Sequence, residues 1–237
     1  MSTTTATLTE HFIEHGRYLR GWSDKTIRTY RQNLATLHAA NIGPLTRASL
    51  KQFVVGLQKR GLTPGGINVR LRSINSFLTW LHEEGHTPDR VRVRLLPDPP
   101  KPITPISDVE IRRLLTFRPT RSWQRRTWTL VLLLLDTGLR LSEALGLDRD
   151  HVDLHNCLIR VRGKGNRERL VPISLECRKR LYVLLKDTTT TPVFATSSGR
   201  RVTSRNGYRA IKRTCHAAGV SGRHIHPHAF RHCFAVT

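Results

Sequence analysis

The stretch Leu130-Val-Leu-Leu-Leu-Leu-Asp-Thr-Gly138-Leu-Arg140 joins an apolar run to a glycine and an arginine. The run is too short to cross a bilayer and carries no charge before Asp136, so it predicts a helix buried on several sides. A glycine just past such a run can adopt the left-handed conformation that ends a helix, and it would then present Arg140 from a rigid base. Ser142 and Glu143 are predicted to open a second short helix. Taken alone, the stretch also fits a core helix followed by a surface arginine.

Upstream of this stretch, four segments place apolar residues at helical spacing behind residues that commonly begin helices, such as Ser23, Thr46 and Thr63-Pro64. They are residues 8–19, 23–37, 46–61 and 63–85. Four amphipathic helices with short connections predict a compact all-α domain over residues 1–86.

The polar faces of these helices carry many cations and few carboxylates, which favours a surface that faces phosphates over one that is merely solvated. The candidate DNA-binding residues on these helices are Lys25, Arg28, Arg31, Arg70 and Arg72, and Lys101 in residues 87–105 is added to them. Half of the 12 prolines lie between Pro88 and Pro105. Prolines interrupt helices, and the segment has too little apolar content for a core, so residues 87–105 are predicted to form a basic, semi-rigid linker.

A second domain is predicted over residues 106–237. Ser107-Asp-Val-Glu110 is a capping box that begins a helix. Beyond the leucine run, the spacing changes to two β-prone segments, 157–162 and 167–173, around Gly163-Lys-Gly-Asn166, which predicts a hairpin with Lys164 at its tip. Further helices are expected from Ser174, over residues 204–218, and after His226. The fold class is therefore mainly α, with a mixed α/β C-terminal domain that contains a small hairpin or sheet.

The charge balance limits the partners. The 237 residues contain 40 Lys and Arg against 17 Asp and Glu, a net charge of +23 spread along the whole length, and nucleic acid is the commonest partner of so basic a protein. A membrane surface fits poorly, because residues 1–9 resemble neither a signal peptide nor a basic anchor. We therefore expect a cytoplasmic protein that associates with the nucleoid when it binds DNA. The four cysteines form no CxxC pair and are expected to be free thiols; zinc on the C-terminal His and Cys cluster is disfavoured by its spacing.

Three separated pieces supply chemistry that suits one phosphate: Arg140 after the buried helix, Lys164 on the hairpin, and His228 with Arg231 on one helix face. A phosphodiester under attack passes through a five-coordinate arrangement with charged non-bridging oxygens, and planar guanidinium groups can donate paired hydrogen bonds to them. Metal ions could do the same work, but we find no convincing pair of carboxylates in the sequence.

These motifs resemble those of the tyrosine recombinase family, the phage-integrase and Xer-like site-specific recombinases. Thr137 to Glu143 resembles the first arginine box of that family, Gly163 to Pro172 its lysine hairpin, and Pro227-His228-Ala-Phe-Arg231-His232 its His-x-x-Arg box. The N-terminal half resembles the core-binding (SAM-like) domain that grips DNA from the opposite side. The resemblance covers nearly the whole chain.

The resemblance implies a role for each residue. Arg140 and Arg231 would stabilise the transition-state phosphate, His228 would assist proton transfer, and Lys164 would act as general acid toward the departing 5′ oxygen. Glu143 would orient Arg140, and His232 would support the site or simply pack there. No cofactor would be needed, because a covalent phosphotyrosine link preserves the bond energy for rejoining. The implied partners are double-stranded DNA and further protomers in a tetramer on two sites.

The sequence departs from the family at its end. In the family, further helices carrying another His or Trp and then the nucleophilic tyrosine follow the His-x-x-Arg box. Here the four tyrosines are Tyr18, Tyr30, Tyr182 and Tyr208, and their surroundings indicate packing. We expect a recombinase truncated before its nucleophile, inactive alone unless another chain supplies the tyrosine. The alternatives are a non-catalytic DNA-binding or regulatory protein on the same scaffold and, less favoured, a metal-dependent nuclease. The target sequence and the element of origin do not follow from these residues.

Overall fold

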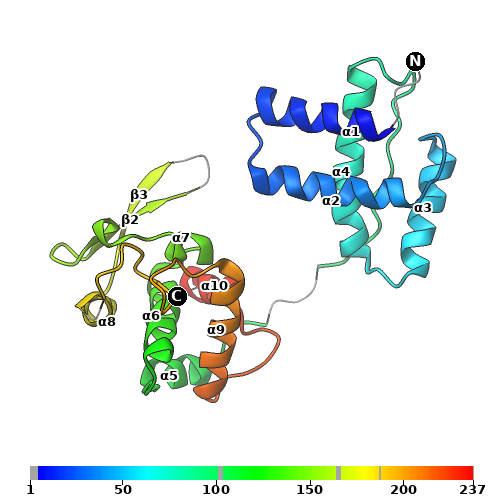
Figure 1. Ribbon diagram of the computed structural model, residues 1–237. Coiled ribbons are helices and arrows are strands. Elements are labelled where there is room, and N and C mark those ends of the chain that lie inside the picture. The colour runs from blue at the N-terminus through cyan, green and yellow to red at the C-terminus, as the bar shows by residue number, and fades with distance from the viewer. Residues whose placement is uncertain (1–4, 101–103, 164–166, 187, 237) are drawn as a thin grey trace. The chain divides into compact units, whose positions relative to one another are not determined.

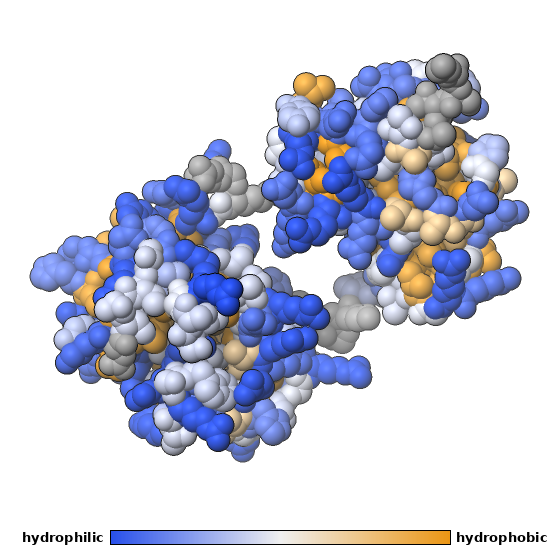
Figure 2. Space-filling view, in the orientation of Figure 1, coloured by the Kyte–Doolittle hydropathy of each residue, from blue (hydrophilic) through white to orange (hydrophobic). Residues whose placement is uncertain are grey.

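The chain folds into two compact units, Met1–Lys101 and Pro102–Thr237 (Figure 1). The computed structural model describes residues 5–100, 104–163, 167–186 and 188–236. Hydrophilic side chains cover most of the visible surface of each unit, and apolar patches are small (Figure 2). Within the described residues, no helix is both long enough and apolar enough to cross a membrane.

The N-terminal unit contains the four predicted helices. They are α1 (Thr5–Glu14), α2 (Asp24–Ala39), α3 (Arg47–Lys59) and α4 (Pro64–Glu83), with a π-helical turn, η1, at His15–Leu19. Ser23, Thr46 and Thr63 each accept a hydrogen bond from a backbone N–H of the following helix, so these predicted helix starts are confirmed. One buried cluster, which includes Phe12 and Phe77, joins the four helices.

The first helix differs from the prediction of a single helix over residues 8–19. The chain leaves α-helical geometry after Glu14 and continues through the wider turn of η1. That change of period rotates Leu19 away from the apolar face, and its side chain is 76% exposed. The predicted helix over residues 8–19 counted Leu19 among its apolar, inward-facing residues, and that part of the prediction was wrong.

The proline-rich segment also differs from the prediction. Val91, Val93 and Leu96 pack against the N-terminal core, although the segment was expected to lack the apolar content for this. The side chains of two asparagines on α4 hold the segment by pairing with its backbone: Asn75 bonds both N–H and C=O of Val93, and Asn68 bonds both groups of Leu96, at 2.8–2.9 Å. Residues 91–96 therefore belong to the N-terminal unit.

The C-terminal unit is built around one buried helix. Its elements are α5 (Asp108–Thr116), α6 (Ser122–Thr137), α7 (Leu141–Leu145), a 3-10 turn η2 (Arg149–His151), β1 (Val152–Asp153), β2 (Leu158–Arg162), β3 (Glu168–Pro172), α8 (Leu175–Lys186), α9 (Ser204–Ala217) and α10 (Pro227–Val236). Eight consecutive residues of α6, Thr127 to Leu134, are buried, as the unbroken apolar run predicts. Helices α8, α9 and α10 pack around α6 (Figure 1).

A three-stranded antiparallel sheet of order β1-β2-β3 stands beside these helices. The predicted hairpin is β2–β3, with Ile159 opposite Val171, and the Gly163 N–H donates to the Arg167 carbonyl at 2.8 Å to close it. Its tip, residues 164–166, lies outside the described residues. Strand β1 was not predicted because two residues are too short to show a period. The fold class, mainly α with a small sheet in the C-terminal unit, is confirmed.

Candidate functional site

The site begins where α6 ends. Gly138 has φ of 60°, the left-handed conformation predicted for it, and its N–H donates to the Leu134 carbonyl at 3.1 Å. The chain then turns into α7, whose N-terminal capping position is occupied by Arg140. The Arg140 side chain is 56% exposed, so its guanidinium faces solvent from a fixed backbone.

Arg231 reaches the same place from α10. Its guanidinium donates to the Gly138 carbonyl at 2.6 Å, which ties α10 to the end of α6. Arg140, His228 and Arg231 together line one open pocket of about 440 Å³. Three cationic or ionisable side chains from two distant parts of the sequence thus border a single space that is wide enough for a phosphate group.

Glu143 fixes the orientation of Arg140. Its carboxylate accepts from the Arg140 backbone N–H at 3.0 Å and from the Arg140 guanidinium at 2.9 Å, and its side chain is only 6% exposed. Burial alone would raise the pKa of Glu143, but hydrogen bonds from Arg169 and Arg140 outweigh it and hold that pKa below its ordinary value. Glu143 is therefore an anion that restricts Arg140 to one geometry.

Arg169 is a positioning residue that the sequence did not reveal. It lies on β3, and its guanidinium donates to Glu143 at 3.0 Å. It thereby links the β2–β3 hairpin to the carboxylate that holds Arg140. Lys164 itself lies outside the described residues. No pattern in the sequence distinguishes Arg169 from Arg167, since only the folded hairpin brings one of them to α7.

Histidines border the pocket on the α10 side. The rings of His228 and His232 meet edge to face at a centroid distance of 4.6 Å. His226 begins α10 by accepting the Ala229 N–H on its Nδ1 at 3.1 Å. Burial, and then the neighbouring charges of His228 and Lys212, lower the pKa of His226. The neutral form of His226 is thus favoured, which suits its role as an acceptor at the helix start.

Tyr208 corrects the sequence-based prediction most directly. Its surroundings in the sequence indicated packing, and Ile211 and Cys215, which lie near it on α9, are fully buried. Tyr208 instead is 41% exposed and lines the pocket with Arg140 and Arg231, and the Lys212 ammonium lies 5.7 Å from its ring centre.

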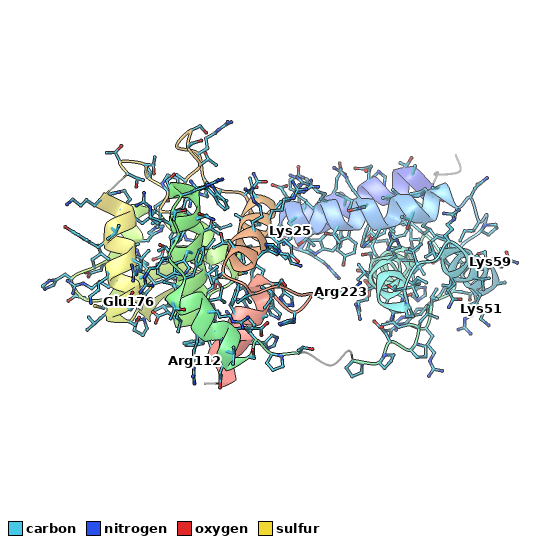
Figure 3. The ribbon with its side chains drawn as sticks, turned by 90° about the horizontal axis from the view of Figure 1, so that it is seen from below. Lys25, Lys51, Lys59, Arg112, Glu176 and Arg223 are labelled. Carbon is cyan, nitrogen blue, oxygen red and sulfur yellow. The ribbon has the colours of Figure 1, made fainter. Side chains whose placement is uncertain are left out.

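The predicted DNA-binding cations lie in different surroundings. Lys25 and Arg28 on α2 and Arg72 on α4 are exposed (Figure 3 labels Lys25). Arg31 is paired with Glu10 at 2.5 Å, and Arg70 donates to the Gly66 carbonyl of its own helix. Lys101 lies outside the described residues. The first three are therefore the most accessible of the set.

The cysteines and the possible metal ligands lie in separate places in the fold. In the described part of the chain, Cys157, Cys177 and Cys215 are free thiols, as predicted. In the described part of the chain, the group of three residues close enough to share a metal ion is Asp148, Asp150 and His151, away from the terminal histidines. Asp148 already pairs with Arg201 at 2.7 Å.

The site thus combines an arginine at a helix end, a His-x-x-Arg helix and an open pocket lined by both arginines. Comparison with known proteins shows the family to which the chain belongs. Residues 106–237 match the phage integrase family. The tyrosine recombinase XerC of Xanthomonas campestris pv. campestris (strain B100) is 30% identical over 98% of this chain and 75% of its own length, and XerC of Pseudomonas aeruginosa (strain PAO1) is 33% identical over 94% and 78%. The chain belongs to the phage integrase, or tyrosine recombinase, family.

Solved structures agree with this fold. The Tn1549 transposon integrase in complex with a circular intermediate DNA superposes with a TM-score of 0.79 at 18% identity, over 96% of this chain and 84% of that one. A lambda integrase dimer bound to a COC′ core site gives 0.76 at 15% identity, over 98% and 69%.

Proposed function

We propose that this protein takes part in site-specific DNA recombination or integration, by metal-independent cleavage and rejoining of strands through a phosphotyrosine link. The observation that carries the proposal is the pocket shared by Arg140, His228 and Arg231. Membership of the tyrosine recombinase family supports it, as do relatives whose structures hold DNA. The substrate would be double-stranded DNA, and the protein would act in the cytoplasm on the DNA of the nucleoid.

In this proposal each residue has a defined task. The tyrosine oxygen attacks phosphorus, and the bond from phosphorus to the 5′ oxygen breaks. Arg140 and Arg231 donate hydrogen bonds to the non-bridging oxygens as their charge develops, and His228 assists proton transfer. Lys164 gives the leaving 5′ oxygen its proton. Glu143 keeps Arg140 in place, with Arg169 behind it, and His232 supports His228.

In this proposal the two units have different roles, DNA binding and catalysis. The N-terminal unit would be the core-binding domain; it includes residues 91–96 in addition to the predicted 1–86. Residues 106–237 would be the catalytic domain. Lys25, Arg28, Arg31, Arg70, Arg72 and Lys101 would contact the DNA backbone, and Lys25, Arg28 and Arg72 are the best placed, since they are exposed. Further protomers would assemble on the same DNA, as a tetramer on two sites.

A nicked suicide substrate carrying the protein's own recombination site tests the proposal. Cleavage near the nick releases a short strand and traps any covalent adduct. We expect a polypeptide of residues 1–237 to shift this duplex in a native gel, without chelator sensitivity, and to leave no adduct on a denaturing gel. We expect none of its tyrosines to occupy the position of the family's nucleophile, so cleavage would require a tyrosine from outside residues 1–237.

The Tyr208→Phe variant is the control for this experiment, because Tyr208 lines the pocket. The variant should behave like the parent polypeptide. A covalent adduct that disappears in Tyr208→Phe would show that Tyr208 is the nucleophile and would contradict the proposed role of a tyrosine from outside these residues. Failure to bind duplex DNA would refute the proposed function altogether.

A further inference from the structure

A second concave surface lies at the other end of the central helix. A groove of about 760 Å³ runs between the first half of α6, helix α8 and the chain that follows α8, and we name it the α6–α8 groove. Figure 3 shows α8 beside α6, with Glu176 on α8. Arg125, at the groove, and Gly138, at the arginine pocket, lie about 20 Å apart along α6 at the helical rise per residue. The groove is therefore separate from the candidate active site.

The floor of the α6–α8 groove is apolar and aromatic. Trp123 and Trp128 line it, two of the four tryptophans in the chain, along with aliphatic side chains of α8 and the following segment. Trp128 is 4% exposed, and its indole N–H donates to the Leu114 carbonyl at 2.7 Å, so its ring is fixed. Trp123 is held by Arg213, whose guanidinium lies 4.5 Å from the ring centre. Trp128 is therefore part of the fixed base of the groove, and a bulky apolar side chain could pack on the partly exposed Trp123 and the aliphatic side chains without first rearranging them.

The rim of the groove is positively charged. Arg118, Arg125, Arg126 and Arg180 line it, and the described residues that line it include no Asp or Glu. Arg180 pairs with Glu176 at 2.6 Å and stacks on Trp128 at 4.7 Å. The other three arginines make no ion pair with a carboxylate in the part of the chain that the structure describes.

Arg126 shows that the rim is not only a solvated surface. It is half-buried and donates to the Ala195 carbonyl, and burial lowers its pKa. A cation that loses water without gaining an anion is incompletely compensated. An incoming carboxylate would supply the missing partner.

The chemistry of floor and rim together selects one kind of ligand. Duplex DNA offers phosphates but no bulky apolar side chain that could pack on Trp123, whereas an acidic peptide can offer both groups. We propose that the α6–α8 groove binds an acidic segment of a partner protein, with an aromatic or aliphatic side chain on Trp123 and the neighbouring aliphatic side chains and carboxylates on the arginines. Because the groove and the arginine pocket lie at opposite ends of α6, the partner and DNA can be bound at the same time.

A labelled synthetic peptide, Glu-Asp-Glu-Phe-Leu-Asp-Glu-Asp, tests the proposal by fluorescence anisotropy in about 150 mM salt, which screens diffuse attraction to the basic surface. Its control is Glu-Asp-Glu-Ser-Gly-Asp-Glu-Asp, which has the same charge and no bulky apolar side chain. The full chain should bind the first peptide at least about tenfold more tightly than the second, since only the first can bury a bulky apolar side chain against Trp123 and its aliphatic neighbours.

Charge reversal locates the binding. Arg118→Glu with Arg125→Glu, both exposed on the rim, should weaken binding of the first peptide about tenfold. Arg112→Glu with Arg178→Glu makes the same change of charge at exposed positions outside the groove and should change the affinity less than about twofold. A short duplex DNA should leave the peptide bound.

Three outcomes would overturn the proposal. Equal affinity for the two peptides would mean that only charge is recognised. Equal weakening by the two double variants would place the binding elsewhere on the basic surface. Displacement of the peptide by duplex DNA, together with loss of DNA affinity in the rim variant alone, would assign the groove to nucleic acid.

Discussion

Glu143 is the residue on which the geometry of the arginine site depends. Its buried carboxylate receives hydrogen bonds from Arg140 at 2.9 Å and from Arg169 at 3.0 Å. A buried anion is stable only when its charge is matched, and here two guanidiniums match it. Removing the charge should therefore affect both the stability of the C-terminal unit and the position of Arg140.

Glu143→Gln should lower the free energy of unfolding of the C-terminal unit by about 1–2 kcal/mol at neutral pH. The pKa of Glu143 is held below its ordinary value in the folded chain, so its contribution is complete above the pKa of the unfolded chain and disappears as the pH falls through the folded pKa. Calorimetry at pH 7 and at progressively acidic pH measures this. A difference between the two proteins that persists at pH values below the folded pKa would contradict the assignment.

Gly138 is a residue whose backbone conformation and close packing leave no room for a side chain. With φ of 60°, it sits where side chains are strained, and an added Cβ would lie 2.4 Å from Cδ1 of Phe234. Gly138→Ala should therefore destabilise the unit by about 2 kcal/mol, through strain and displacement of Phe234. Gly219→Ala is the matched control, since Gly219 has φ of 73° and open space around it. The two thermal shifts should differ, and equal shifts would show that Phe234 moves without cost.

At the residue scale, a position could be predicted where neighbouring residues in the sequence determine it. Gly138 and Arg140 follow an apolar run, and His228 and Arg231 share one helix face, so their places could be read before the fold was known. Tyr208 and Arg169 could not be placed, because helical spacing alone does not say whether a tyrosine at the edge of an apolar face is covered, and only hairpin pairing brings Arg169 to Glu143. Lys164 stays a prediction.

At the scale of elements, the hairpin and α7 act together. Strand β3 carries Arg169, which reaches the buried carboxylate of α7, and the adjacent Gly163–Arg167 hydrogen bond closes the hairpin next to its tip. The contact between Arg169 and Glu143 thus joins β3 to α7.

Arg169→Gln should loosen this tie. We expect amide hydrogen exchange at the β2–β3 hairpin to speed up by about tenfold, the equivalent of one lost charge-assisted hydrogen bond. Arg167→Gln serves as control, because Arg167 is exposed on the same hairpin. Mass-spectrometric exchange on peptides covering residues 158–172 provides the measurement, and equal exchange in the two variants would remove Arg169 from the positioning role.

Elements could be predicted where capping residues and long apolar periods coincide, as at Ser23, Thr46, Thr63 and Ser107. Prediction failed where the cause is tertiary. Leu19 is exposed because η1 changes the helical period, and Val93 is packed because Asn75 on α4 pairs with its backbone. The spacing of apolar residues predicts neither the change of helical period in η1 nor the hydrogen bonds between Asn75 and Val93.

At the scale of the whole molecule, the net charge of +23 is distributed over two units that each have their own core. The charge predicts strong attraction to any polyanion, so DNA binding alone would not identify the site. A discriminating experiment has to separate the two pocket arginines from the remaining positive charge.

The most direct measurement is the dependence of DNA affinity on salt, determined for the unmodified chain and for two double variants. Each phosphate contact contributes a slope of about −0.9 in a plot of log affinity against log salt concentration. Because both arginines contact the same phosphate, Arg140→Ala with Arg231→Ala should make the slope shallower by about one. Arg112→Ala with Arg178→Ala, an equal loss of charge at exposed positions, should leave it nearly unchanged. Identical slopes for the two folded double variants, or a slope of zero for the unmodified chain, would contradict the account that Arg140 and Arg231 grip a DNA phosphate.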